Sequence, residues 1–255
     1  MKTISIINLK GGVGKTVTAV NMAYNLNNLG YKVLLIDNDK QGNSSRFFGA
    51  HSYERPSLAD VLTQKDFPVT TAIVQTEYNG LDVLPANMNL LRADKEILMD
   101  CTRPQQTRMR KALDSVRDVY DYAIIDNAPD LNMGVINALV ASDDVIIPIK
   151  VDSFAFDGLE QIMEQIGEVR EFNQNLKVAG CIITMEQKNK VYELGQQFLK
   201  TYTGIPLFET KIRRTVKVDE STFTGKPLLQ HSKNCTAAKD YQEFVNEYLK
   251  KCDRN

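Results

Sequence analysis

The sequence has no tryptophan and few of the features that mark secreted, metal-binding or membrane-spanning proteins. Its four cysteines, Cys101, Cys181, Cys235 and Cys252, form no CxxC pair of the kind that metal and redox sites use. We therefore expect reduced structural thiols, as in most cytosolic proteins. No apolar run approaches the roughly 20 residues that a membrane-spanning helix needs, and the first residues do not resemble a signal peptide. These absences predict a cytoplasmic protein without a membrane partner.

Neither sign of charge dominates the sequence, and histidine is scarce. The chain has 31 Lys and Arg residues against 32 Asp and Glu residues, which gives a net charge of −1. The charge of the whole molecule therefore does not attract it to DNA or to an acidic membrane, so such binding would need a local basic patch. His51 and His231 have no partner at a metal-binding spacing, and we interpret them as structural or surface residues.

The most informative segment is glycine-rich and covers residues 4–20. It predicts a buried strand from Ile4 to Asn8, a glycine turn, and a helix that begins at Lys15. A turn of this kind directs backbone N–H groups and the positive end of a helix dipole at one point, which suits a phosphate group. Lys15 can place its charge on the β and γ phosphates, and the Thr16 hydroxyl can bind Mg²⁺. The alternative is a glycine turn with solvated lysines.

The exact motif in this segment departs from the standard GxxxxGK[ST] pattern, because Leu9 stands where the first glycine is expected. The chain reads KGGVGKT instead, with a second lysine, Lys10. Here it resembles the deviant Walker A group of P-loop ATPases, the ParA/MinD family. The resemblance implies ATP and Mg²⁺ as cofactors, and a homodimer in which Lys10 reaches the partner's nucleotide. The nucleotide-binding residues that it implies in this loop are Lys10, Gly11, Gly12, Val13, Gly14, Lys15, Thr16 and Val17.

The order of strand, glycine loop, helix and strand predicts a single α/β domain over residues 1–255, with a doubly wound, mostly parallel sheet flanked by helices. Apolar runs without alternation, such as VLLID at 33–37, are typical of parallel strands that are buried on both faces. The predicted strands are 4–8, 33–37, 81–85, 122–126, 144–150 and 177–185. The predicted helices are 15–29, most of 88–118, 132–141, 154–173, 190–203 and 238–251.

Three aspartates follow predicted strands at the edge where a nucleotide would bind. Asp37 can face the water shell of Mg²⁺, and Asp39 can accept a hydrogen bond from an attacking water. Asp126 ends a strand in the Walker B manner and can support Mg²⁺ or its Thr16 ligand. We therefore predict Thr16, Asp37 and Asp126 as the metal site and Lys10, Lys15 and Asp39 as catalytic residues. The alternative is that these acidic residues only end strands and open turns.

The same segments depart from the family pattern at two places. The family motif DxDPQGN has proline where this chain has Lys40, and the family motif DxPP corresponds here to Asp126-Asn127-Ala128-Pro129, followed by Asp130. The segment 137–159 also resembles the family. By that analogy Asp152 lies at the edge of the nucleotide site that faces the dimer, although an exposed aspartate at the start of a loop is the alternative.

A basic segment at 211–218, KIRRTVKV, resembles the family segment IPRNVxLSE, with Arg213 in place of proline. The resemblance implies that this region contributes to the base pocket, through Met185, Ile212, Arg213 and Arg214, and to nonspecific DNA binding. Clustered Lys and Arg side chains bind phosphates without reading sequence. The alternative is a solvated run of charge. The predicted DNA-binding residues are Lys188, Lys190, Lys211, Arg213, Arg214 and Lys217.

The resemblance predicts an ATP-dependent DNA-partitioning ATPase of plasmids or chromosomes that is associated with the nucleoid. Its ATP-bound dimer binds DNA, and a ParB-like centromere-binding protein stimulates hydrolysis. Because the first strand begins near residue 3, we expect no separate N-terminal DNA-reading domain. The alternative is a MinD-like switch that acts on a membrane or a protein, although no basic amphipathic tail follows Leu249. A metabolic or redox enzyme is a third option, but Cys101 has no second cysteine beside Asp126.

Overall fold

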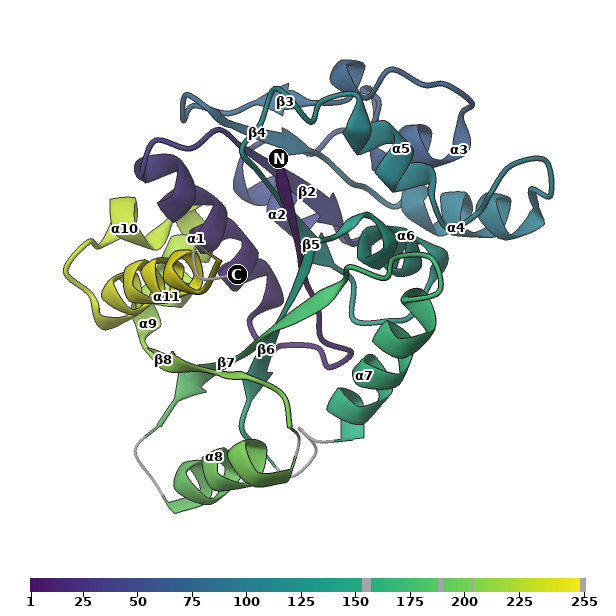
Figure 1. Cartoon of the computed structure of the whole chain (residues 1–255). Coiled ribbons are helices and arrows are strands. Elements are labelled where there is room, and N and C mark those ends of the chain that lie inside the picture. Colours follow the sequence, from purple (N-terminus) through teal and green to yellow (C-terminus); the bar gives the residue numbers. More distant parts are fainter. Residues whose placement is uncertain (153–156, 188–189, 203, 253–255) are drawn as a thin grey trace.

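One eight-stranded sheet with helices on both faces organises the chain in the computed structural model (Figure 1). The structure describes residues 1–152, 157–187, 190–202 and 204–252. The strand order is β3-β4-β2-β5-β1-β6-β7-β8, and every pairing is parallel except that of β3 with β4. The predicted doubly wound, mostly parallel sheet is confirmed.

The strands and helices follow one another along the chain in the alternation that parallel sheets require. The strands are β1 (Lys2–Ile6), β2 (Val33–Asn38), β3 (Val74–Gln75), β4 (Leu81–Leu84), β5 (Tyr122–Asn127), β6 (Asp144–Lys150), β7 (Lys177–Glu186) and β8 (Leu207–Arg213). The helices are α1 (Lys15–Asn28), α2 (Asn43–Phe47), α3 (Leu58–Thr63), the 3₁₀ turn η1 (Val69–Thr71), α4 (Asn89–Met99), α5 (Arg108–Asp114), α6 (Met133–Ala141), α7 (Asp157–Val169), α8 (Lys190–Tyr202), α9 (Val216–Thr224), α10 (Leu228–His231) and α11 (Thr236–Cys252).

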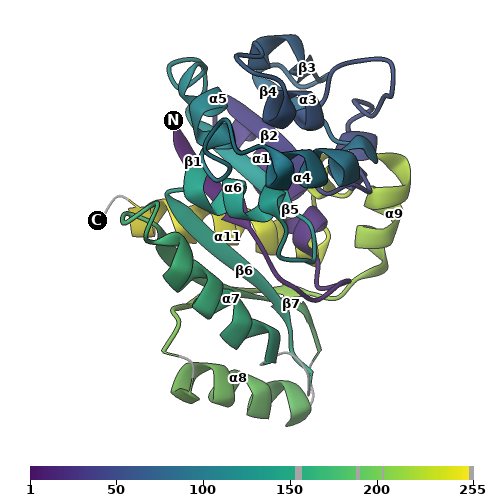
Figure 2. The same ribbon diagram turned by 90° about the vertical axis from the view of Figure 1, so that its right-hand side faces the viewer.

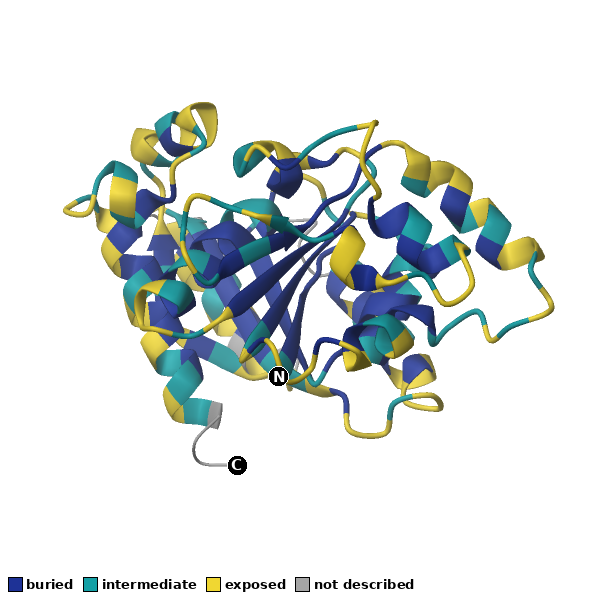
Figure 3. Cartoon of the chain, turned by 90° about the horizontal axis from the view of Figure 1, so that it is seen from above, coloured by how far each residue is buried: buried dark blue, intermediate teal, exposed yellow. Residues whose placement is uncertain are grey.

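The central strands are buried on both faces, because each face packs on a different core. On β2, Leu35 belongs to the core beneath α1 and α11, while its neighbour Leu34 belongs to the core beneath α3 and α5. Figure 3 shows the strands as a buried layer between more exposed helices. The sheet thus lies between two layers of helices, and the carboxyl ends of its parallel strands lie at one edge.

The helices divide between the two faces as the chain crosses the sheet. Helices α1 and α11 contact each other on one face, and α5, α6 and α7 form a contiguous layer on the other. Figure 1 shows α11 on one side of the sheet and α6 and α7 on the other, and Figure 2 views the molecule from the side of α6 and α7. The loops that leave β1, β2, β5 and β6 consequently meet between the layers, and these loops hold the candidate site.

The segment 88–118, which the sequence predicts to be mostly helical, forms the two helices α4 and α5 with a turn between them. Asp100 accepts hydrogen bonds from the backbone N–H and the hydroxyl of Thr102, and Pro104 cannot continue a helix because it lacks an N–H donor. Strand β8 was not predicted, although its residues alternate between buried and exposed positions. The predicted helix 154–173 begins, and the predicted helix 190–203 ends, at residues that lie outside the described part of the chain.

Candidate nucleotide-binding site

The glycine loop after β1 ends at α1 in the conformation that a phosphate-binding turn needs. Gly12 and Gly14 have φ angles of 70° and 87°, which side chains with a Cβ rarely adopt. Gly14 precedes the first residue of α1, so the free N–H groups of this helix point into the loop. Lys15 Nζ donates a hydrogen bond to the carbonyl oxygen of Lys10 at 2.9 Å, which places the ammonium over the loop. The loop therefore has the geometry of an anion site.

Two carboxylates from neighbouring strands lie next to this loop. Asp37 on β2 and Asp126 on β5 occupy paired positions in the sheet, and both are buried. Asp37 Oδ2 accepts hydrogen bonds from the N–H and hydroxyl of Ser45, at 2.8 and 2.7 Å, and Asp126 Oδ2 accepts one from the Ser44 hydroxyl at 2.5 Å. The sequence reasoning missed Ser44 and Ser45, whose only signal was their place after a glycine that follows β2.

This carboxylate pair is unfavourable while both members are charged. Burial, together with the neighbouring Asp126, raises the pKa of Asp37 to about 7. Burial also raises the pKa of Asp126 to about 6, although hydrogen bonds from Ser44 and Thr16 act against the rise. A divalent cation would favour the ionised form of both groups, since it offsets their mutual repulsion.

The residues present fit the Mg²⁺ ion that the sequence predicts. Asp126 Oδ1 is buried and has no hydrogen-bond partner among the residues that the structure describes. Thr16 lies close enough to Asp126 to influence its pKa, so a hydroxyl and two carboxylates gather at one place. Oxygen ligands of this kind, few in number and supplemented by water and phosphate, are those that Mg²⁺ prefers. The three predicted metal residues are thus brought together.

Lys15 faces the same group of carboxylates. Burial lowers the pKa of its ammonium, whereas the charges of Asp126, Asp39 and Asp130 act in the opposite direction. A cation in this position has few water contacts, because Lys15 is only 8% exposed. It would consequently interact strongly with a phosphate that enters the loop.

Lys10, the second lysine of the motif, is held by its own chain. Its Nζ atom lies 2.5 Å from both carboxylate oxygens of Asp152, which follows β6. The structure therefore brings Asp152 to the nucleotide edge, where the family resemblance had placed it. The contact joins the loop after β1 to the loop after β6.

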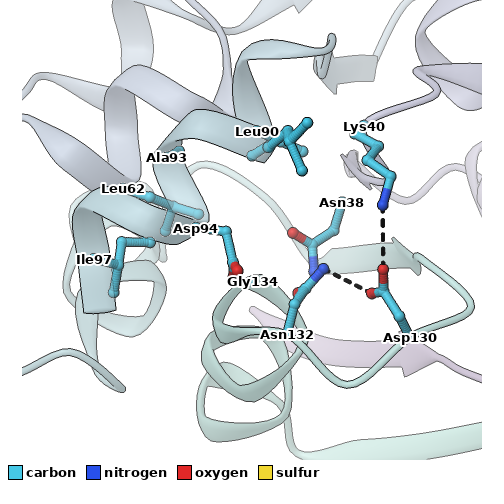
Figure 4. Close-up of a pocket in the computed structure, with 11 residues that line it drawn as sticks. Asn38, Lys40, Leu62, Leu90, Ala93, Asp94, Ile97, Asp130, Asn132 and Gly134 are labelled. Atoms are coloured by element: carbon cyan, nitrogen blue, oxygen red, sulfur yellow. Dashed lines mark hydrogen bonds and ion pairs between the residues drawn. The ribbon is translucent and has the colours of Figure 1, made fainter. Parts of the chain in front are cut away.

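Asp39 lies in a tight turn at the end of β2. Its backbone N–H donates to Asp37 Oδ1 at 3.2 Å, and its Oδ1 accepts from the N–H of Gln41 at 2.9 Å. These bonds orient the Asp39 carboxylate beside Asp126 and Lys15, whose pKa values it influences. Lys40, which replaces the family's proline, pairs with Asp130 at 3.3 Å. The lysine that replaces the proline thus contacts the acidic residue that follows the Walker B segment (Figure 4).

A cavity of about 210 Å³ opens beside the glycine loop, on the side of β7 and β8. All four residues predicted for a base pocket line it, next to Gly14 and Val17 of the loop. Met185 has a φ of 53°, an uncommon conformation for a residue with a side chain. The described structure adds residues that the sequence reasoning did not name. The remaining lining residues are Lys150, Thr184, Gln187, Thr215, Val218, Asp219 and Tyr241.

Three of the six predicted DNA-binding cations have acidic neighbours. Arg213 pairs with the buried Asp240 at 2.5 Å, and Lys217 pairs with Glu220 at 2.7 Å. Lys211 lies 3.4 Å from Glu186. These pairs reduce the positive charge of the segment. Of the other three residues, Arg214 is exposed, Lys190 begins α8, and Lys188 lies outside the described residues.

The comparisons with known proteins agree with this arrangement. A family model described as an AAA domain matches residues 1–178. The chromosome partitioning protein ParA of Caulobacter vibrioides is 37% identical over 98% of this chain and 94% of its own length. The sporulation initiation inhibitor protein Soj of Bacillus subtilis is 34% identical over 96% of this chain and 97% of its own. The chain belongs to the ParA family of P-loop partition ATPases.

Solved structures place the same fold around nucleotides. Cobyrinic acid a,c-diamide synthase from Mycobacterium smegmatis, with a bound ATP analogue and magnesium, has a TM-score of 0.86 and 27% identity, and covers 99% of this chain and 96% of its own. A putative plasmid partition protein from Borrelia burgdorferi, bound to AMPPNP, has a TM-score of 0.79 and 25% identity, and covers 99% and 98%. The predicted ATPase class is confirmed, and ATP and Mg²⁺ agree with these neighbours. Within the described residues, no helix is long and apolar enough to span a bilayer.

Proposed function

We propose that this ParA-family chain is a DNA-partitioning switch, in which Mg²⁺ and ATP close a homodimer that binds DNA without sequence specificity. The observation that supports it most is the convergence of the glycine loop, the Asp37–Asp126 pair and the base cavity at one edge of the sheet. A relative named for chromosome partitioning is similar in sequence to this chain over nearly its whole length. Partner-stimulated hydrolysis, by a ParB-like protein, would then release the dimer from nucleoid DNA.

In this proposal each group at the strand ends has one role. The loop N–H groups and Lys15 bind the phosphates, and Thr16 binds Mg²⁺, with Asp37 and Asp126 orienting its water ligands. Asp39 accepts a hydrogen bond from the attacking water and so fixes its position. The cavity beside Met185 and Ile212 receives the base. ATP supplies the phosphoryl group that is transferred to water.

Lys10 provides the connection between nucleotide and dimer. In the single chain its ammonium is bound by Asp152, so it is neutralised at the surface that would face a second copy. Closure of the dimer would exchange this contact for one with the partner's nucleotide, where a cation stabilises the charge that develops during phosphoryl transfer. Hydrolysis would therefore be slow until the dimer forms.

We expect the DNA affinity of the ATP-bound protein to depend on Arg214 and Lys217. Replacing both with alanine should weaken binding to a nonspecific duplex at least about 10-fold at low salt and reduce its salt dependence, because each cation releases counterions from the DNA. Arg213 is left in place, since its removal would leave the buried Asp240 without its cation. Fluorescence anisotropy with a labelled duplex measures the affinity.

The matched control replaces two exposed cations, Arg92 on α4 and Arg117 in the turn after α5, which have acidic partners. The control protein should bind DNA like the wild type. If the Arg214 and Lys217 variant bound with unchanged affinity and salt dependence while it still bound ATP, the DNA surface would have to lie elsewhere.

A further inference from the structure

The glycine loop has a buried contact with β7 through the side chain of Thr184. The Thr184 hydroxyl donates a hydrogen bond to the carbonyl oxygen of Val13 at 2.7 Å, although the two residues are 171 positions apart in the chain. Thr184 is 2% exposed and Val13 is 1% exposed. In the sheet, β7 lies on the other side of β1 from β2 and β5, the strands that hold the carboxylate pair. The loop is therefore supported from the side that carries no carboxylate of the metal site.

The carbonyl group of Val13 lies outside the hydrogen-bond ladder of α1. The first bond of this helix runs from the N–H of Thr18 to the carbonyl oxygen of Gly14, at 2.9 Å. No backbone N–H of a described residue donates to the carbonyl of Val13. Because a buried carbonyl without a donor is costly, the hydroxyl of Thr184 determines where this group points.

The same bond fixes the N–H of the next residue. The carbonyl of Val13 and the N–H of Gly14 belong to one planar trans peptide, in which they point in opposite directions. A carbonyl held toward β7 thus turns the Gly14 N–H away from β7. Val13 stands between Gly12 and Gly14, whose backbone angles are less restricted than those of other residues. This peptide could rotate easily if nothing outside the loop held it.

Thr184 is itself held firmly. It is part of a paired strand, and the Tyr192 hydroxyl on α8 donates to the carbonyl oxygen of the next residue, Met185, at 2.7 Å. Its methyl group also lies against the loop, since a Cβ atom at Gly14 would be 3.6 Å from Thr184 Cγ2. A hydroxyl on a packed strand is placed more precisely than one on a loop.

The other end of the glycine loop is anchored in a similar way, by Asn8. Its Oδ1 accepts from the N–H of Lys10 at 2.9 Å, and its Nδ2 donates to the carbonyl oxygen of Pro148 on β6 at 2.8 Å. Between the two anchors, Gly11 and Gly12 are exposed, and a Cβ atom at either would meet nothing within 4 Å. The loop is thus fixed at its two ends, against β6 and β7, and open in its middle.

We propose that Thr184 is a positioning residue for the phosphate groups of the nucleotide. It acts through the carbonyl of Val13 and orients the Gly14 N–H before the nucleotide arrives, so that less of the binding free energy is spent on ordering the loop. Thr184 also lines the base cavity, so direct contact with the base is the alternative that the test must separate. The inference rests on the proposed function, because it takes the glycine loop as the phosphate site.

The test compares Thr184→Val with Thr184→Ser. Valine has nearly the shape of threonine but cannot donate, so the affinities for ATP and for ADP should each fall at least about 10-fold. Serine keeps the hydroxyl and should bind both nucleotides within about threefold of the wild type. Adenosine can occupy the base cavity but has no phosphate, and it should bind all three proteins equally. Isothermal titration calorimetry with Mg²⁺ measures the nucleotides, and ¹H–¹⁵N NMR titration measures adenosine.

The matched control is Thr63→Val on α3. The Thr63 hydroxyl also donates to a backbone carbonyl, that of Ala59, at 2.8 Å, but it does not contact the glycine loop. This variant should bind nucleotides like the wild type. Thermal unfolding reports whether each protein is folded, and Thr184→Ala, which removes the hydroxyl without adding bulk, replaces the valine variant if valine prevents folding.

Three results would overturn the proposal. They are an unchanged ATP affinity in a folded variant without the hydroxyl, no recovery with serine, and a loss of adenosine binding as large as the loss of ATP binding. Lys15→Ala is measured alongside to separate this inference from the proposed function. If Lys15→Ala bound ATP like the wild type, the phosphate site would be wrong and the inference with it. If Lys15→Ala lost ATP binding while Thr184→Val kept it, only the inference would be wrong.

Discussion

Replacing Lys15 with alanine is expected to abolish detectable ATP binding. Lys15 is 8% exposed, and its ammonium lies over the glycine loop beside three carboxylates. Without it, the phosphates would meet the negative charge of Asp37 and Asp126 without the buried ammonium that offsets it in the same chain. Charge-assisted hydrogen bonds contribute about 1.5–3 kcal/mol each, so the loss of the contacts that Lys15 makes should weaken binding by about 100-fold or more.

Isothermal titration calorimetry with Mg²⁺ and ATP measures this effect directly. Lys95→Ala, on the exposed face of α4, is the matched control and should bind ATP like the wild type. Far-UV circular dichroism and thermal unfolding report whether the Lys15→Ala protein is folded. A folded Lys15→Ala protein that bound ATP with wild-type affinity would show that the glycine loop is not the phosphate site.

Replacing Asp39 with alanine should separate binding from hydrolysis. The Asp39 carboxylate is oriented by Gln41 and contacts no described part of the glycine loop through a hydrogen bond, so ATP affinity should be retained. The rate of phosphate release should fall by about 10²–10⁴-fold, the usual contribution of a positioned proton acceptor. A coupled phosphate assay under saturating ATP measures the rate.

The control for this variant is Asp118→Ala, which removes an exposed carboxylate near β5 and far from the loop along the chain. It should hydrolyse ATP at the wild-type rate. If Asp39→Ala did so too, the water would have to be positioned by another group. If Asp39→Ala lost ATP binding instead, Asp39 would belong to the binding site.

The parts of the site that were predictable are those whose cause is local. The glycine loop, Lys15 and Thr16 follow one another in the sequence, and the turn geometry that they need is encoded by the adjacent glycines. Asp37 and Asp126 each end an apolar run, and parallel strands place their carboxyl ends at one edge of the sheet. These elements required no knowledge of distant contacts.

The contacts that were not predictable join residues far apart in the chain. Ser44 reaches Asp126, Lys10 reaches Asp152, and the pairing of Arg213 with Asp240 depends on how α11 packs against β8. Local sequence indicated charge at these positions but not which partner each charge has. The surface of the basic segment at 211–218 is therefore less positive than predicted, because Glu186, Asp240 and Glu220 lie next to three of its cations.

The strand β8 was missed for a different reason. Its residues alternate between buried and exposed positions, but the charges of KIRR hide this alternation in the sequence. Edge strands of this kind are weakly marked in sequence. The prediction of helices over most of 88–118 likewise did not specify the turn between α4 and α5, which Asp100 and Thr102 form through local hydrogen bonds.

The central claim is that ATP, and not ADP, switches this ParA-family chain to a DNA-binding state. The most direct test is the affinity of the wild-type protein for a nonspecific DNA duplex, measured with Mg²⁺ and ATP, with Mg²⁺ and ADP, and without nucleotide, over a series of salt concentrations. The account predicts salt-sensitive binding with ATP that is at least about 10-fold tighter than with ADP, because only ATP closes the dimer and doubles the basic surface. Equal affinity in all three states, or no binding at low salt by a protein that dimerises with ATP, would contradict it.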